Sequence, residues 1–355
     1  MMNDAEPPAL QRLRDRVREA SARRASLVIR AGGTKDFYGN PTHGERLDPR
    51  ELTGIVDYAP TELVVTVRAG TPLADLEAAL SAERQFLPFE PPHFGVGATV
   101  GGAVAAGIAG PRRVAAGGLR DFVLGARVID GRGELLSFGG RVMKNVAGYD
   151  MARTLAGSLG TLGVLADVSL KVLPQPVAER TLSFAMDEAT AITQLNTWGG
   201  QPLPISASAW LDGELRVRLS GARAAVEAAG AKLGGDVIDA ADRWWADLRE
   251  QRLPFFAGDA PLWRVALPPA TPPLRMAATL IEWHGGQRWV RGDHAPEAMY
   301  PMARQLGGHA TRFRGGDAAQ PAFQPLDAAL ARISARLKAE FDPAGIFNPG
   351  RLLPA

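Results

Sequence analysis

Apolar positions along the first hundred residues predict a helix, then a strand, then a glycine-bearing loop. The opening helix has apolar side chains at helical spacing, at Leu10, Leu13, Val17 and Ala20. Arginines fill much of its other side, which is typical of a solvated face. Residues 26–30 form a short β-rich run that breaks at once into the sequence AGGTKDFYG at residues 31–39.

The same alternation continues to residue 173. Residues 63–67 predict a strand, and the spacing of Leu73, Leu76 and Leu80 predicts a helix after it. Residues 126–130 and 134–138 flank the sequence GRG, which indicates a hairpin with a glycine turn. A short helix over residues 150–155 and an apolar strand ending at residue 173 complete this part.

Pro174 and Pro176 mark a boundary, because two prolines so close together end a strand. Beyond them strands (181–186, 206–211, 214–219) alternate with helices (189–198, 222–233), which predicts a sheet covered on one face. A last helix spans 326–341. We therefore expect an α+β chain with a first domain at 1–176, a smaller α+β cap domain at 177–325, and a C-terminal helix and tail at 326–355.

Composition excludes several classes of protein. The 355 residues contain no cysteine, so this chain forms no disulfide, no thiolate metal site and no iron–sulfur cluster of its own. The formal net charge of +2 is too small to indicate a nucleic-acid partner. No apolar run reaches the length of a membrane span, and the N-terminus lacks the pattern of a signal peptide. We expect a cytoplasmic protein.

Glycine clusters carry the candidate chemistry. They fall beside apolar runs, at Gly95, Gly97, Gly101 and Gly102, at Gly107 and Gly110, and at Gly157, Gly160 and Gly163. Glycine permits a positive φ, which lets successive N–H groups point into one concavity and hold a phosphate or a ring carbonyl. Ordinary turns are the alternative interpretation. Three clusters in one region favour a binding function.

The loop after residue 30 is a fourth candidate. A strand that enters a glycine pair can present the N–H groups of residues 32–35 to a diphosphate, with the Thr34 hydroxyl as a further donor. A plain turn is again the alternative. No helix signal follows, so the loop does not fit the G-x-G-x-x-G pattern of NAD-binding βαβ units.

Three segments together resemble a known family. They read ATVGGAVAAGIAGPRR from residue 98, GLRDFVLGARVIDGRGE from 118 and KNVAGYDMARTLAGSLGTLGVLADVSLKV from 144. The resemblance is to the vanillyl-alcohol oxidase and p-cresol methylhydroxylase (PCMH) superfamily, and within it to the E subunits of glycolate oxidase. A DP-x-G-I-x-NPG motif at residues 342–350 extends it to the end of the chain. The resemblance implies a PCMH-type FAD-binding domain of two subdomains, covered by the cap and joined by the returning tail.

The cofactor implied is FAD. The residues expected to bind it are Arg30, Ala31, Gly32, Gly33, Thr34, Lys35, Pro92, Gly97, Ala98, Thr99, Gly101, Gly102, Ala105, Gly107, Lys144, Asn145, Gly148, Tyr149, Gly157, Ser158, Gly160, Thr161, Gly163, Val164, Asn348 and Arg351. Relatives with covalently tethered flavin carry a histidine in the first loop, where this chain has Thr34 and Lys35. We therefore expect non-covalent FAD.

Candidate catalytic residues are few. His284 and Arg288 lie in a run between two indoles, where a cation and an imidazole can hold a small carboxylate or stabilise reduced flavin. The favoured alternative is a β-hairpin with Gly285 and Gly286 at its turn and Trp283 paired with Trp289 across the strands. The five histidines show no pattern of metal ligands, and no metal is expected.

The resemblance implies an FAD-binding subunit of a glycolate oxidase (dehydrogenase) complex, which relays electrons or supports a larger catalytic flavoprotein subunit. Its expected partners are that larger FAD-binding glycolate oxidase subunit and an iron–sulfur subunit, with a small 2-hydroxy acid as substrate of the assembly. Membrane contact is expected only at the periphery, through the partners. Two alternatives stay open: a self-sufficient FAD-dependent hydroxy-acid or alcohol oxidoreductase, and a structural subunit with an empty flavin pocket.

Overall fold

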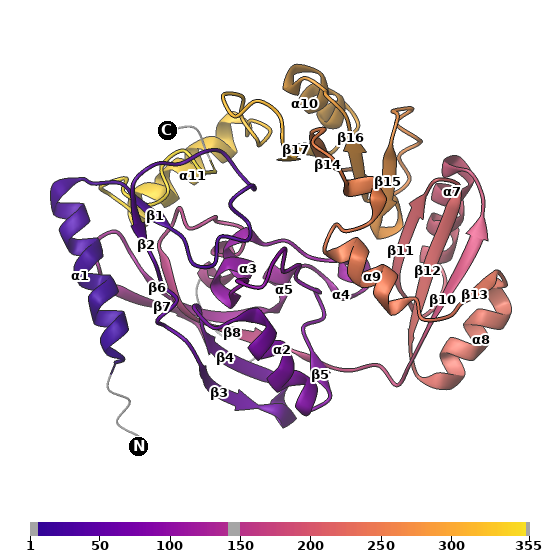
Figure 1. The fold of residues 1–355 in the computed structure, drawn as a ribbon, viewed down its shortest axis with the longest axis horizontal. Helices are drawn as coiled ribbons and strands as arrows, with labels where there is room; N and C mark the ends of the chain where they lie inside the picture. The colour runs from indigo at the N-terminus through magenta and orange to yellow at the C-terminus, as the bar shows by residue number, and fades with distance from the viewer. Residues whose placement is uncertain (1–5, 141–149, 353–355) are drawn as a thin grey trace.

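The computed structural model describes residues 6–140 and 150–352, and its strands form two main sheets (Figure 1). The first sheet has the strand order β3-β4-β8-β6-β7 and is antiparallel throughout. Its strands are β3 (Ile55–Ala59), β4 (Val64–Arg68), β6 (Val123–Ile129), β7 (Leu135–Gly139) and β8 (Val164–Lys171). The predicted strand at 63–67 and the predicted hairpin across GRG are both present. The α+β class expected from the sequence is confirmed.

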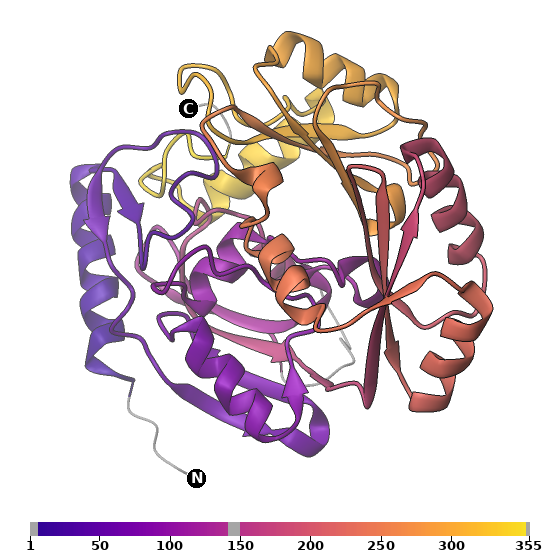
Figure 2. The same ribbon diagram turned by 45° about the vertical axis from the view of Figure 1, so that its right-hand side comes forward.

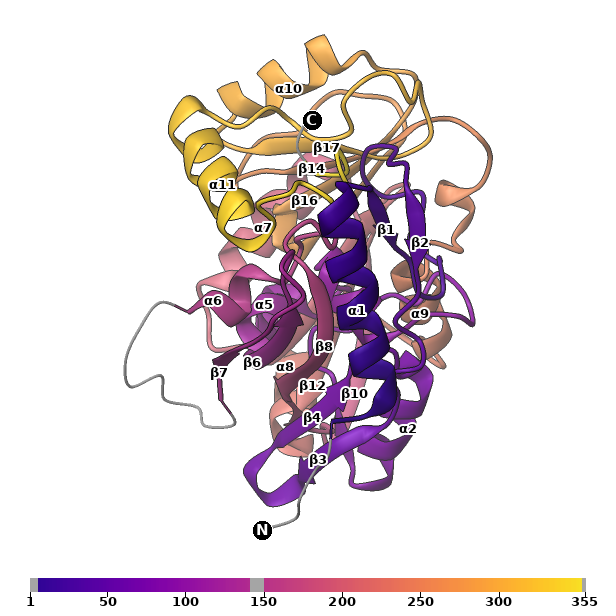
Figure 3. The ribbon, with the colours of Figure 1, turned by 90° about the vertical axis from the view of Figure 1, so that its left-hand side faces the viewer.

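Helices and short ladders surround this first sheet. Helix α1 lies on the outside of this half (Figure 3), where it buries the predicted apolar stripe and leaves most of its arginines exposed. Strands β1 and β2 form a small parallel ladder next to it. The bounds are α1 (Pro8–Arg23), β1 (Leu27–Ile29), β2 (Glu45–Leu47), α2 (Leu73–Ala82), β5 (Gln85–Phe86), α3 (Val100–Ala106), α4 (Arg113–Ala116), α5 (Leu119–Phe122), α6 (Met151–Thr154) and β9 (Leu173–Pro174).

The second sheet has eight strands in the order β13-β10-β12-β11-β15-β16-β14-β17. Its strands are β10 (Ala178–Ala185), β11 (Ile205–Leu211), β12 (Glu214–Gly221), β13 (Asp236–Ile238), β14 (Leu262–Ala266), β15 (Thr279–Glu282), β16 (Gln287–Arg291) and β17 (His309–Arg314). The helices of this part are α7 (Glu188–Gly199), α8 (Arg223–Leu233), α9 (Asp242–Arg249) and α10 (Pro296–Gln305). No helix among the described residues is long and apolar enough to cross a membrane.

The two faces of the eight-stranded sheet have different partners. Helices α7, α8 and α10 pack on one face, where they form two apolar clusters with the strands. The other face turns toward the first sheet, with α9 between them (Figure 2). There Trp289 and Phe313 of the sheet share one apolar cluster with Tyr38 and Leu159 of the N-terminal half. Apolar side chains from the two halves therefore pack directly against one another.

The last residues of the chain return to the N-terminal half. Helix α11 (Ala328–Phe341) ends at Asp342, whose carboxylate accepts hydrogen bonds from the N–H groups of Ile346 and Phe347. Phe347 is fully buried beside β1 and forms a parallel bridge with Leu27. Residue 348 is thereby brought to the end of β1.

One sequence-based prediction is wrong in its register. Strands β15 and β16 form an antiparallel hairpin, as expected, but Trp289 pairs with Leu280 and not with Trp283. Trp283 lies in a 3-10 turn after β15, where it has a positive φ and donates a hydrogen bond to the carbonyl of Gly110 at 3.1 Å. The turn takes up more residues than Gly285 and Gly286 alone, so the predicted cross-strand tryptophan pair does not form.

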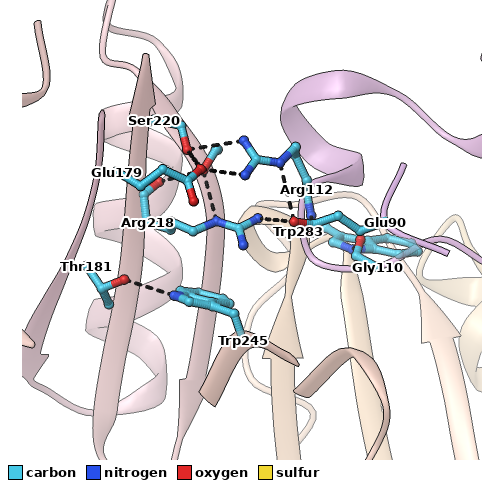
Figure 4. Close-up of polar contacts among 10 residues, drawn as sticks. Glu90, Gly110, Arg112, Glu179, Thr181, Arg218, Ser220, Trp245 and Trp283 are labelled. Carbon is cyan, nitrogen blue, oxygen red and sulfur yellow. Dashed lines mark hydrogen bonds and ion pairs between the residues drawn. The ribbon is translucent and has the colours of Figure 1, made fainter. Parts of the chain in front are cut away.

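A partly buried ionic network joins the two halves next to this packing (Figure 4). Arg112 of the N-terminal half donates hydrogen bonds to Glu90 at 3.3 Å and to Glu179 of β10 at 2.5 Å. Arg218 of β12 reaches back to Glu90 at 2.8 Å, and Ser220 binds both Arg112 and Glu179. Burial by itself raises the pKa of Glu179, but the charge and hydrogen bonds of Arg112 hold it below its usual value. The network therefore needs ionised carboxylates, and it weakens as the pH falls through that lowered pKa.

We predict that Glu90→Gln lowers the free energy of unfolding by about 3–5 kcal/mol, because Arg112 and Arg218 are left buried with too little negative charge. Urea unfolding at neutral pH measures the change. The exposed pair of Asp15 and Arg18 provides the control, since Asp15→Asn should stay within about 0.5 kcal/mol of the parent chain. Equal effects of the two substitutions would contradict the importance of the network.

Candidate functional site

A cavity of about 380 Å³ lies where three segments of the N-terminal half meet the tail. Residues 28–36 form one wall, residues 97–106 a second and residues 155–165 a third, and Asn348 and Arg351 close it from the tail. Its volume lies within the range of about 300–1,000 Å³ that small-molecule sites occupy. Glycines from three regions that are far apart in the sequence, at residues 32–33, 97–102 and 160–163, therefore line one cavity, whereas Gly107 and Gly110 do not.

The loop that follows β1 turns its amide groups toward this cavity. None of the backbone N–H groups of residues 31–35 donates a hydrogen bond to another described part of the chain. The next N–H, that of Asp36, returns to the carbonyl of Gly33 at 3.1 Å. Five consecutive unpaired N–H groups beside a cavity are costly unless a ligand or water accepts from them. Such a run forms an anion-binding concavity.

Two arginines bind carbonyl groups at the two ends of the same loop. Arg46 donates to the carbonyl oxygens of Arg30 at 3.4 Å and of Ala31 at 3.2 Å. Arg351 donates to those of Lys35 at 3.3 Å and of Asp36 at 2.9 Å. Burial lowers the pKa of Arg351, and Asp36 opposes that effect. The two ends of the loop are thereby fixed, one to β2 through Arg46 and the other to the tail through Arg351.

Two glycines are required where the first and second segments touch. A side chain at Gly32 would place its Cβ 1.6 Å from the carbonyl oxygen of Gly97, so only glycine fits. Gly101 is equally confined, since a Cβ there would lie 2.6 Å from that of Ala69. The backbone of the second segment can therefore come close to the first and to a ligand bound between them.

Asn348 connects the first segment to the third. Its side-chain oxygen accepts from the N–H of Ile29 at 2.7 Å, and its side-chain nitrogen donates to the carbonyl of Leu159 at 2.6 Å. The side chain is buried, and a Cβ at Gly160 would lie 2.7 Å from it. One amide group thus fixes the spacing of two walls of the cavity.

Lys35 is a cation at the edge of the cavity. Its Nζ donates to the carbonyl of His93 at 3.2 Å, and Thr34 accepts from it at 3.4 Å. Burial lowers the pKa of Lys35 to about 8, while the charge of Glu250 acts in the opposite direction. The unfolded chain therefore binds more protons than the folded chain between pH 8 and 10.5, and stability rises with pH across that window. A bound anion would raise this pKa and remove the effect.

Most of the residues expected to bind FAD line the cavity. They are Arg30, Ala31, Gly32, Gly33, Thr34, Lys35, Gly97, Thr99, Gly101, Gly102, Ala105, Ser158, Gly160, Gly163, Val164, Asn348 and Arg351. Pro92, Ala98 and Gly107 do not line it, and Gly157 and Thr161 line a neighbouring groove instead. Lys144, Asn145, Gly148 and Tyr149 lie outside the described residues.

The two weak catalytic candidates lie elsewhere. Arg288 is fully buried, and it donates to the carbonyl oxygens of Gly285 and Thr271, both at 2.9 Å. Its guanidinium is 3.6 Å from Glu188, and burial lowers its pKa to about 10. Burial also lowers the pKa of the His284 imidazole. The backbone N–H of the same residue donates a hydrogen bond to the hydroxyl of Ser208. Neither residue lines the cavity; Arg288 is held by carbonyl groups, whereas the Nε2 of the His284 imidazole is buried with no hydrogen-bond partner among the described residues.

Sequence reasoning missed Arg46 and several apolar lining residues. Arg46 reaches the loop only through backbone carbonyl groups, which leaves no motif in a sequence. The apolar residues include Val28, Ile29, Ala69 and Leu159, and they are the ends of strands and loops that were already predicted. A strand that leads into a glycine pair was the available signal for Val28 and Ile29. Among the described residues no group of acids and histidines could hold a metal ion.

Comparisons with known proteins agree with this geometry. A family model described as FAD binding domain matches residues 5–139. The chain is 47% identical to glycolate oxidase subunit GlcE of Escherichia coli (strain K12), over 96% of this chain and 97% of that protein. It is 31% identical to glycolate oxidase subunit GlcD of Bacillus subtilis (strain 168), over 49% of this chain and 37% of that protein. A solved structure of alkyldihydroxyacetonephosphate synthase aligns with a TM-score of 0.65 at 15% identity, covering 97% of this chain and 75% of that one, which shows a shared fold.

We predict that Asn348→Ala lowers the free energy of unfolding by about 1–3 kcal/mol, because a buried N–H and a buried carbonyl lose their partner. Urea unfolding measures the loss. Asn196→Ala in the eight-stranded half is the matched control and should stay within about 0.5 kcal/mol, since that amide is partly exposed. If the Asn348 variant were as stable as the parent chain, other contacts would have to hold the two walls of the cavity in place.

Proposed function

The chain belongs to the family of glycolate oxidase subunit GlcE, and from that premise we propose that it is the FAD-binding subunit of a complex that oxidises glycolate to glyoxylate. The identity extends over nearly the whole of both chains. The observation that carries the proposal is the run of five unpaired N–H groups at residues 31–35, in a cavity that the predicted glycine segments share.

The cofactor is FAD, and the residues of the cavity fit it. The N–H groups of residues 31–35 would bind the diphosphate, and Lys35 would supply a positive charge beside it. Asn348, Arg46 and Arg351 hold the loops that present these groups. Gly32, Gly97 and Gly101 keep the backbone close to the ligand. The first loop has no histidine or cysteine, so the cofactor is held without a covalent bond to it.

The described residues around the cavity supply binding groups but no complete set for oxidising a hydroxy acid. FAD, when bound, accepts a hydride from such a substrate, and a base must take the hydroxyl proton. No acid–histidine metal cluster is present in the described ranges, and neither His284 nor Arg288 lines the cavity. We therefore assign substrate oxidation to a larger flavoprotein subunit, of which the Bacillus GlcD is a relative, and electron relay or flavin support to this chain.

An iron–sulfur subunit would complete the assembly. This chain has no cysteine, so such a cluster would be bound by another polypeptide. We place the complex in the cytoplasm, with membrane contact through its other subunits.

We predict that the purified chain is yellow and that acid releases about one FAD for each chain, because the cavity holds the cofactor without a covalent bond. Anaerobic glycolate should leave the flavin of the isolated chain oxidised and should bleach it when the larger subunit is added. Absorbance spectra measure both effects. A colourless chain that does not take up added FAD would favour the empty structural subunit. Bleaching of the isolated chain by glycolate would instead favour a self-sufficient oxidoreductase.

A further inference from the structure

Exposed apolar side chains gather on one helix of the molecule. Seven large hydrophobic residues are exposed among the described residues, and three of these, Leu326, Leu330 and Ile333, fall within eight residues. Their exposed fractions are 41%, 50% and 62%. The other four, Ile55, Val96, Val177 and Val237, are scattered over the chain. Single exposed apolar residues need no explanation, but a cluster marks an interaction surface.

Two of the three, Leu330 and Ile333, belong to an apolar stripe that leaves the core, and Leu326 lies just before the helix. Leu330, Ile333, Leu337 and Phe341 follow helical spacing along α11, and only Phe341, at the end of the helix, is buried. Lys338 fixes that end, because its Nζ donates to the carbonyl oxygens of Thr161 and Phe347. The rest of α11 projects from the body of the molecule (Figures 1 and 3). A helix that is anchored at one end and apolar on an open face lacks a partner.

A groove of about 1,230 Å³ runs beneath this helix. One side is formed by α11 with Leu326, Leu330 and Leu337, and the other by residues 308–311 at the edge of the eight-stranded sheet, with Phe323 and Leu352 also exposed to it. This volume exceeds the range typical of small-molecule sites. The groove is therefore suited to a segment of polypeptide.

The charges of the groove favour an acidic occupant. Its carboxylates are already engaged: Asp327 caps α11 by accepting from the N–H groups of Ala329 and Leu330, and Asp342 binds Lys338. Its arginines have no carboxylate partner among the described residues. Arg264 donates to the hydroxyl of Tyr38 at 3.0 Å, and Arg304 donates to a backbone carbonyl.

Two further cations extend this charge along the helix. Arg332 and Arg336 lie on exposed positions of α11 and form no ion pair with the described residues. His309 lies in the groove with a pKa that burial lowers and that the charges of Arg264 and Arg113 lower further. The surface thus combines leucine and isoleucine side chains with arginines that have no carboxylate partner among the described residues.

We propose that the open face of α11 and the groove beneath it are the docking surface for the larger flavoprotein subunit, which contributes a segment of apolar side chains and carboxylates. This inference rests on the proposed function, since it names where that subunit binds. The apolar stripe would supply the buried centre of the interface, and the arginines would pair with acids at its rim.

Two other occupants fit the surface less well. A second copy of this chain related by twofold symmetry would bring Arg332 and Arg336 toward the same residues of its partner, which like charges oppose. A membrane surface would attract the arginines, but a bilayer is flat and cannot fill a groove of this depth. The charge and the concave shape together favour an acidic protein segment.

The test uses the FAD-loaded chain and the purified larger flavoprotein subunit of the same organism. We predict that the double substitution L330E/I333E weakens binding at least tenfold, because it places charge at the centre of the interface. The double substitution R332E/R336E should slow association and reduce its dependence on salt. Biolayer interferometry at two salt concentrations measures the affinity and both rate constants. FAD content and circular dichroism should stay at parent values, since the four side chains are exposed.

Val177→Glu with Val237→Glu is the matched control, because these two residues are exposed at other positions. Parent-like binding by the control and weakened binding by the α11 variants support the docking surface. Parent-like binding by L330E/I333E overturns it while leaving the complex itself intact. If the parent chain does not bind the larger subunit at all, the proposed function fails and the docking surface fails with it. If L330E/I333E keeps its binding to the larger subunit but loses self-association, the surface binds a second copy of this chain and the proposal is overturned. If it instead loses binding to anionic phosphatidylglycerol vesicles, the surface binds a membrane and the proposal is likewise overturned.

Discussion

The candidate site depends on one feature of the backbone: residues 31–35 line the cavity, and their five N–H groups have no hydrogen-bond partner among the described residues. A peptide group cannot turn one end without the other, so Arg46, which binds the carbonyls of Arg30 and Ala31, fixes the peptide groups that carry the N–H groups of Ala31 and Gly32. Unpaired N–H groups would destabilise a closed core. Beside a cavity they create a preference for an anion with several oxygen acceptors, such as a diphosphate.

The rest of the fold positions this loop. Helix α11 and the turn after it return the chain to β1, and Asn348 then spans from Ile29 to Leu159. The ionic network around Glu90 and the apolar cluster around Phe313 hold the eight-stranded sheet against the same half. The tail and the interface between the halves therefore both stabilise the site, although each lies far from residue 31 in the sequence.

The sequence indicated the segments of the site more reliably than their contacts. Glycine clusters beside apolar runs indicate where the backbone comes close to another segment or to a ligand. In the structure, Gly32 lies against Gly97 and Gly101 lies against Ala69. Arg46 was not predictable, because its contact with the loop is made to backbone carbonyl groups, which follow no motif. The register of the second hairpin was also out of reach. Trp283 lies in a turn with a positive φ, which is rare for a tryptophan, and this moves it away from Trp289.

The affinity of the apo chain for FAD compared with riboflavin tests the central claim most directly, because riboflavin has the same ring system without the diphosphate and adenosine. If the amides of residues 31–35 bind the diphosphate, FAD should bind at least about a hundredfold more tightly than riboflavin, which corresponds to about 2.8 kcal/mol of binding free energy. FMN, with one phosphate, should fall between the two. Equal affinities for all three flavins would contradict the account, because the cavity would then bind the ring system and the amide-lined loop would contribute nothing.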